Sequence, residues 1–140
     1  FYGVYCGQSA LPLAPDSLYY LTNDAIENCT VYDFQNNRAG QVYDFGRAMG
    51  KDPYELFLSG PLSLLTMENP QAQAGRELIL FRDSFGSSIA PLLISGYSKI
   101  TLVDIRYIHP DYLARFIDFE GCDVLVLYST LVLNNSETLK

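Results

Sequence analysis

The chain has 140 residues, enough for one compact domain, and we expect residues 1–140 to form a single domain. Hydrophobic residues make up 49% and charged residues 18% of the sequence, as in folded globular proteins. The net charge of −7, without any cluster of lysine and arginine, argues against nucleic acid or an anionic membrane as a partner. No apolar run is long enough to span a membrane, so we expect no membrane insertion.

The N-terminal part predicts short elements joined by loops. Residues 16–21 and 28–34 have strand character and are separated by Asn23-Asp24, a turn pair, so we expect an antiparallel β-hairpin. Residues 36–40 are a cluster of turn formers. Two short helices are predicted next, over residues 43–49 and 52–58, and the second begins at Asp52-Pro53. A strand is predicted over residues 63–67.

The second half of the sequence predicts a βαβαβ pattern. Residues 78–81 form an apolar run that is too short for a helix, and residues 87–95 have apolar positions at helical spacing. Residues 99–104 predict a second strand, and Pro110 opens a second helix. Residues 123–128 show no polar alternation, which predicts a strand buried on both faces. We therefore expect an α/β fold of three layers with a mostly parallel sheet.

The turn Asp83-Ser84 is the main candidate for a functional site. It follows a buried strand and precedes a helix, a place where open α/β folds bind ligands. Backbone N–H groups at the start of that helix favour an oxyanion, so Ser84 is a candidate nucleophile. Asp and Ser are also the usual helix N-caps, and this second role stays open. Gly60 could supply a second oxyanion donor, or it could end the short helix before it.

Arg106 and His109 follow the next strand at the same edge of the predicted sheet. Arg106 is a candidate anchor for a substrate anion, or else a partner in an ion pair with Asp83 or Asp104. His109 is the only histidine and hence the only local candidate for a base that activates Ser84. It also stands where it would cap the helix that begins at Pro110.

The sequence predicts no cofactor and no metal ion. Its three cysteines, Cys6, Cys29 and Cys122, lack the spacing of a metal site or of a disulfide framework. Cys122 begins an apolar run and is expected to be a small core residue. The dinucleotide-binding, phosphate-binding and zinc-protease motifs GxGxxG, P-loop and HExxH are absent.

Several motifs together resemble one protein family. They are Phe1-Tyr2-Gly3-Val4-Tyr5, Pro15-Asp16-Ser17-Leu18, Asp52-Pro53-Tyr54-Glu55-Leu56-Phe57-Leu58-Ser59-Gly60, Arg82-Asp83-Ser84-Phe85-Gly86, Tyr97-Ser98-Lys99-Ile100, Val103-Asp104-Ile105-Arg106-Tyr107 and Asp123-Val124-Leu125-Val126-Leu127-Tyr128. Their order and spacing are similar to the C-terminal part of the DHHW proteins, exported cell-envelope proteins mainly of Gram-positive bacteria. The resemblance covers nearly the whole chain.

The DHHW proteins in turn resemble SGNH-type O-acetyltransferases and esterases of the alginate-acetylation group. The resemblance implies an SGNH/flavodoxin-like fold, with Ser84 as nucleophile, Gly60 in the oxyanion hole and Arg106 near the site. In that group the Asp and His of the triad precede the Ser. The signature Asp-His-His-Trp is absent here and would lie upstream of Phe1, so we expect an incomplete domain. Pro61 stands where an Asn often follows the family's glycine.

These implications predict a serine esterase or O-acetyltransferase that acts on acylated carbohydrate, outside the cell or in its envelope. The 140 residues alone would hold the nucleophile turn without its Asp-His pair and would be inactive. A non-catalytic module that binds glycan or protein on the same fold is the alternative. A third expectation is a self-sufficient site with His109 as its base. The sequence does not determine the oligomeric state.

Overall fold

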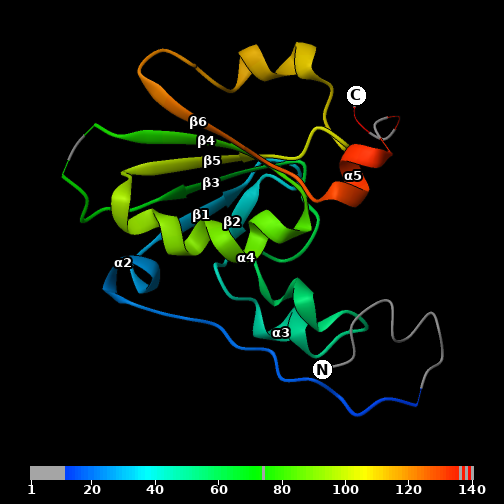
Figure 1. Ribbon diagram of the computed structural model, residues 1–140. Helices are drawn as coiled ribbons and strands as arrows, with labels where there is room; N and C mark the ends of the chain where they lie inside the picture. The colour runs from blue at the N-terminus through cyan, green and yellow to red at the C-terminus, as the bar shows by residue number, and fades with distance from the viewer. Residues whose placement is uncertain (1–11, 74, 136, 138, 140) are drawn as a thin grey trace.

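The computed structural model describes residues 12–73, 75–135, 137 and 139 (Figure 1). Its centre is a six-stranded sheet in the order β2-β1-β3-β5-β4-β6. The strands are β1 Thr30–Asp33, β2 Arg38–Gly40, β3 Leu64–Glu68, β4 Glu77–Arg82, β5 Lys99–Val103 and β6 Cys122–Leu127. The helical segments are α2 Asp24–Glu27, α3 Phe45–Ala48, η1 Pro53–Leu56, α4 Ser84–Leu93, η2 Ile94–Gly96, η3 Pro110–Arg115 and α5 Thr130–Asn134.

The sheet is mixed, not mostly parallel as the sequence predicted. β4 is parallel to both β5 and β6, which confirms the predicted βαβαβ half. The pairs β1–β2, β1–β3 and β3–β5 are antiparallel. The fold is therefore α/β, with a parallel set of three strands extended by an antiparallel set. The β1–β2 pair is antiparallel because only residues 34–37 join its two strands, a connection too short for a crossover.

The predicted N-terminal hairpin exists, but it uses other residues. Residues 16–21 form no strand, and Asn23 begins α2 by accepting a hydrogen bond from the Ile26 N–H at 2.9 Å. β1 pairs instead with β2, which lies inside the stretch expected to be a turn. The chain reverses at residues 34–37, where Asn37 adopts a positive φ of 52° and the β1 residue Asp33 accepts a hydrogen bond from the Asn36 N–H. Asn tolerates this left-handed conformation better than most residues.

Apolar residues on β4 alternate between two core clusters. Leu78 and Leu80 belong to the cluster that contains Ala90 of α4, whereas Ile79 belongs to the cluster that contains Leu113 of η3. Figure 1 shows α4 and the η3 segment, coloured between yellow and orange, apart from each other across the sheet. None of the described helices has both the length and the hydrophobicity of a membrane span.

The prediction that residues 123–128 are buried on both faces is wrong. β6 is the last strand of the sheet and pairs only with β4 among the described residues. Its Val124 and Val126 side chains are 54% and 64% exposed. Cys122 at its start was expected in the core, but it is only partly buried and packs against the margin of the second core cluster. Cys6 and the predicted motif of residues 1–5 lie outside the described residues.

Candidate functional site

The carboxyl ends of β4 and β6 bring two turns together. The two strands are parallel and in register, with Arg82 opposite Leu127. The residues that follow them, Asp83-Ser84 and Tyr128-Ser129, therefore leave the sheet at the same edge. β4 lies between β5 and β6, so the connection from β4 through α4 leads to one side of it, and the connection from β5 through η3 leads to the other side. Such a switch in direction is where open α/β sheets bind ligands.

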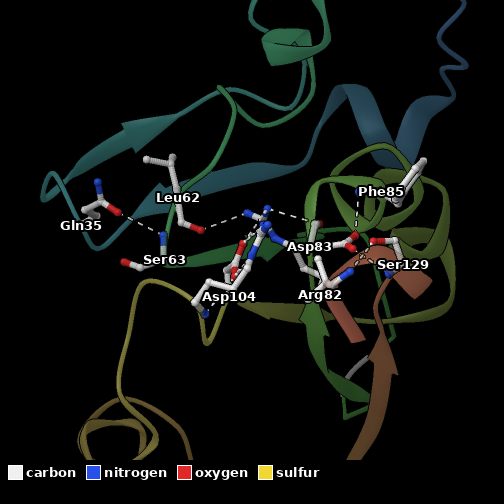
Figure 2. A network of polar contacts seen from close by, with 10 residues as sticks. Gln35, Leu62, Ser63, Arg82, Asp83, Phe85, Asp104 and Ser129 are labelled. Atoms are coloured by element: carbon white, nitrogen blue, oxygen red, sulfur yellow. Dashed lines mark hydrogen bonds and ion pairs between the residues drawn. The ribbon is translucent and has the colours of Figure 1, made fainter. Parts of the chain in front are cut away.

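Asp83 is the residue that fixes the turn. Its buried carboxylate accepts hydrogen bonds from the Phe85 N–H at 3.0 Å and from the Ser129 N–H at 2.7 Å (Figure 2). The sequence offered both Asp83 and Ser84 as the helix N-cap, and the structure shows that Asp83 is the one that caps α4. Ser84 is the first residue of the helix and is exposed. The structure thus leaves its hydroxyl accessible.

Gly86 allows this turn to be tight. A Cβ atom at Gly86 would lie 2.4 Å from the Cβ of Arg82, closer than any two such carbons can approach. The first turn of α4 can therefore rest on the end of β4 only because residue 86 has no side chain. Ser84 begins α4 two residues after β4 ends at Arg82 and therefore lies close to the end of the sheet.

A group of charged side chains lies buried beneath the turn. Arg82 is fully buried, and its guanidinium donates to the Leu62 carbonyl at 3.1 Å and to the Asp83 carbonyl at 3.5 Å. Its Nη1 atom also lies 3.9 Å from the carboxylate of Asp104. Figure 2 shows the Arg82 side chain between these groups. Burial lowers the pKa of Arg82 from its ordinary value, and the neighbouring Asp104 opposes that shift.

Asp104 holds Arg106 in the ion pair that the sequence allowed. The Nε and Nη2 atoms of Arg106 donate to the two carboxylate oxygens of Asp104 at 2.9 and 2.6 Å. This two-point contact raises the pKa of Arg106. Arg106 is thereby fixed in orientation while it still reaches solvent.

A cavity of about 410 Å³ collects most of the predicted site residues. Ser84, Gly60 and Arg106 all line it. Its remaining lining residues come mostly from η1 and the loop after it: Asp52, Tyr54, Glu55, Phe57, Pro61, Ser87 and Tyr107. The structure therefore brings together three residues that lie in separate parts of the sequence.

The loop that carries Gly60 has an unusual backbone. Leu58, Ser59 and Gly60 have positive φ angles of 54°, 59° and 91° in succession. Two of these are not glycine, and such conformations concentrate at functional sites. The Gly60 N–H donates to the Phe57 carbonyl at 3.2 Å within the turn. Gly60 thus borders the cavity while its own N–H is already engaged.

His109 takes the capping role that the sequence offered as one alternative. Its Nδ1 atom accepts a hydrogen bond from the Asp111 N–H at 3.3 Å and caps η3. The side chain is exposed and is not among the residues that line the cavity around Ser84. The structure does not bring His109 together with the other predicted site residues.

Sequence reasoning missed Arg82 and two aromatic side chains of the cavity, Phe57 and Tyr107. Arg82 has the same strand parity as Leu78 and Leu80, which face the core, and an arginine at such a position is a signal for a buried ion pair. Tyr107 carried no comparable signal, because the chain has eleven tyrosines. Within the described residues, no group of three or more His, Cys, Asp or Glu side chains could hold a metal ion.

No family model matches the sequence, and no curated protein matches it. Solved structures do match. A DHHW family protein from Eubacterium siraeum gives a TM-score of 0.54 at 23% identity, over 79% of this chain and 38% of that one. PatB1 from Bacillus cereus, solved with a sulfonyl adduct, gives 0.55 at 21% identity over 80% and 38%. The chain shares the fold of these proteins.

The resemblance to DHHW proteins that the sequence indicated is thus supported by the fold. A second structure of Bacillus cereus PatB1 gives a TM-score of 0.54 at 21% identity. The chain spans 36–38% of the length of these solved chains. The likeness therefore concerns one part of each of those proteins.

Proposed function

We propose that the chain carries the nucleophile of an SGNH-like serine esterase or O-acetyltransferase that acts on acylated carbohydrate in the cell envelope. The observation that carries the proposal is that Ser84 is exposed at the start of α4 and shares a cavity with Gly60 and Arg106. The fold likeness to PatB1, whose structure holds a sulfonyl adduct, supports it, since sulfonyl reagents attach to activated nucleophiles. The three-layer SGNH arrangement is part of this proposal.

In the proposed reaction, the Ser84 Oγ atom attacks the acyl carbonyl and forms a tetrahedral oxyanion. Asp83 already accepts from the N–H groups of Phe85 and Gly86, whereas the Ser84 N–H has no hydrogen-bond partner among the described residues. The Ser84 N–H is therefore available to hold the oxyanion. Gly60 would contribute a second N–H after a change in the hydrogen bond that it now makes to Phe57.

The base in this proposal comes from outside the cavity described here. No histidine is among the described residues that line it. In the O-acetyltransferases that the sequence resembles, an Asp-His pair precedes the serine. In this proposal such a pair takes the proton from Ser84. The tetrahedral intermediate then collapses, its bond to the donor's alcohol breaks, and the alcohol leaves with the proton that the histidine returns to it. The resulting acyl-enzyme ester passes its acyl group to water or to a sugar hydroxyl, whose proton returns to Ser84 through the histidine. Both outcomes use the same nucleophile.

A non-catalytic module that binds glycan on the same fold is the second candidate. The observation that favours it is the cavity lining, in which Tyr54 is partly exposed, Tyr107 is exposed, and histidine is missing from the described residues. Aromatic side chains of this kind pack against sugar rings without any reaction. In this case Ser84 would serve only as the first residue of α4.

The experiment that separates the two candidates is covalent labelling with a fluorophosphonate. We would label this chain, any longer polypeptide that contains it, and the Ser84→Ala variant of each. Ser17→Ala is the matched control, because Ser17 is exposed and lies far from the cavity in sequence. Labelling of the longer polypeptide that Ser84→Ala abolishes and Ser17→Ala preserves would support the enzyme. If the folded protein is never labelled, the enzyme is rejected and the non-catalytic binding module is the supported candidate.

A further inference from the structure

A second cavity lies where β4 and β5 begin, at the opposite end of these strands from Ser84. Its volume is about 710 Å³, and its lining includes Asn23, Asp24, Asn69, Gln71, Ser95 and Tyr97. Figure 1 shows α2, which contributes Asp24, at one end of the sheet and α5 at the other. β4 has six residues, so its two ends are roughly 20 Å apart. The cavity is therefore separate from the one that Ser84 lines.

Hydrogen bonds fix the segments that form this second cavity. Asn69 is 7% exposed, and its Nδ2 atom donates to the Ile94 carbonyl at 3.3 Å. Its Oδ1 atom accepts from the Gln71 N–H at 3.0 Å. The Nδ2 atom of Asn23, which begins α2, donates to the Ser95 Oγ atom at 3.2 Å. The walls of the cavity are thus held in place by the fold, which lowers the entropic cost of binding a ligand.

The lining of the second cavity has little free charge. Arg76 and Asp24 are the two charged residues among the described lining residues. Arg76 forms an ion pair with Asp123 at 2.8 Å, and its guanidinium lies 5.2 Å from the centre of the Tyr97 ring. The cavity therefore offers no unpaired cation that would favour a phosphate. A metal ion is equally disfavoured, because no described group of three or more metal-binding side chains lies here.

Carboxamide groups are what the second cavity offers a ligand instead. The side chains of Gln71 and Gln73 make no hydrogen bond among the described residues, and both line the cavity. A carboxamide carries a donor and an acceptor side by side, so it can bind two neighbouring hydroxyl groups at once. Asp24 adds a carboxylate, which accepts stronger hydrogen bonds from hydroxyl groups. Neighbouring hydroxyl groups without charge are the chemistry of a sugar ring.

We propose that the second cavity binds a neutral saccharide. Gln71 and Asp24 bind its hydroxyl groups, and the Tyr97 ring provides an apolar surface for its C–H groups. The Tyr97 ring is fixed for this role, because its hydroxyl donates to Asp123 at 3.1 Å. This inference goes beyond the proposed function, since the site lies at the other end of the sheet and uses no reaction at Ser84.

The test is a titration of the ¹⁵N-labelled chain with maltotriose, cellotriose and N,N′,N″-triacetylchitotriose, followed by NMR. We expect saturable shifts of the Gln71, Ser95 and Tyr97 amides with at least one of them, and a Kd of about 0.1–5 mM. Sorbitol has hydroxyl groups but no ring, and it should bind at least about tenfold more weakly. The proposal is overturned if no trisaccharide shifts these amides, if sorbitol binds equally well, or if the saturable shifts occur only around Ser84.

Two variants locate the binding within the second cavity. Gln71→Ala and Asp24→Asn should each weaken it at least about fivefold, because each removes hydrogen bonds to the saccharide. Gln41→Ala and Asp111→Asn are the matched controls, at exposed residues outside this cavity. Gln71 and Asp24 are exposed as well, so urea unfolding should show nearly unchanged stability in all four variants. Wild-type affinity in both cavity variants, or an equal loss in the controls, would contradict the assignment.

The saccharide titration and the labelling of Ser84 fail independently. Saccharide binding at the second cavity without any labelling would preserve this inference and reject the enzyme. Labelling of Ser84 without saccharide binding at the second cavity would preserve the enzyme and reject this inference.

Discussion

The carboxylate of Asp83 accepts a hydrogen bond from the backbone N–H of Ser129 at 2.7 Å, across 46 residues of sequence. The same carboxylate caps α4 through the N–H of Phe85. One side chain thus fixes the start of the helix that carries Ser84 and also the chain that leaves β6. The geometry of the candidate site depends on this contact.

Asp83→Ala should therefore destabilise the fold by about 2–4 kcal/mol. The substitution removes a helix cap, worth about 1 kcal/mol, and leaves the Ser129 N–H without its acceptor. Urea unfolding followed by circular dichroism measures the loss. The control is Asp111→Ala, at a side chain that is 86% exposed, with an expected change below about 0.5 kcal/mol. Equal effects of the two substitutions would show that Asp83 has no special structural role.

Gly86→Ala should cost about 2–3 kcal/mol, because the new Cβ meets the Cβ of Arg82 at 2.4 Å. Relief requires α4 to shift away from β4, so labelling of Ser84 in an active polypeptide should fall as well. Gly96→Ala is the matched control, since its Cβ would meet no atom within 4 Å. That variant should be unchanged or up to about 1 kcal/mol more stable. Thermal unfolding of both variants checks the contrast.

Val126→Thr should change the free energy of unfolding by less than about 0.5 kcal/mol. Val126 is 64% exposed on β6, so its hydroxyl-bearing analogue remains hydrated. Val103→Thr on β5 introduces the same hydroxyl at a fully buried position and should cost about 1–3 kcal/mol. Denaturant titration compares the two. A cost at Val126 as large as that at Val103 would mean that another strand or chain covers β6 in solution.

Cys29 should react slowly with iodoacetamide at pH 8. Burial raises the pKa of its thiol to about 11, and only the thiolate reacts. A rise of the thiol pKa from 9.0 to about 11 predicts a rate roughly 100-fold lower than that of the same cysteine in urea. The measurement uses a variant in which Cys6 and Cys122 are serine. If Cys29 reacts as fast in the folded protein as it does in urea, its thiol pKa is not raised by folding.

The same shift predicts how Cys29 affects stability at high pH. Its folded pKa lies above the unfolded value, so the unfolded state loses the thiol proton first. The contribution of the neutral thiol to stability is therefore complete below about pH 9 and decreases as the pH approaches 11. Cys29→Ser should reduce this dependence in urea titrations between pH 8 and 10.5.

The local elements of the second half could be predicted from sequence, because their signals are local. The apolar run at 78–81, the helical spacing after Ser84 and the pair His109-Pro110 gave β4, α4 and the cap of η3. Helix caps and short buried strands depend on a few neighbouring residues. These signals do not need the rest of the fold.

The wrong predictions concern strands whose exposure or extent depends on the strands they pair with. The sequence of β6 is typical of a strand between two layers, yet its exposure is set by the absence of a further neighbour among the described residues. Arg38 has turn formers on both sides, but pairing with β1 makes it part of β2. Strand pairing is a contact between distant segments, and no short window of sequence contains it.

The sequence by itself determined the residue types of the site and the turn on which Ser84 lies. Only the tertiary structure decided that Gly60, Ser84 and Arg106 share one cavity and that His109 stays outside it. It also decided that Asp104 serves two arginines at once. The physical reason is that helix capping and strand formation are local, whereas the sharing of a buried carboxylate depends on how separate strands end at one edge of the sheet.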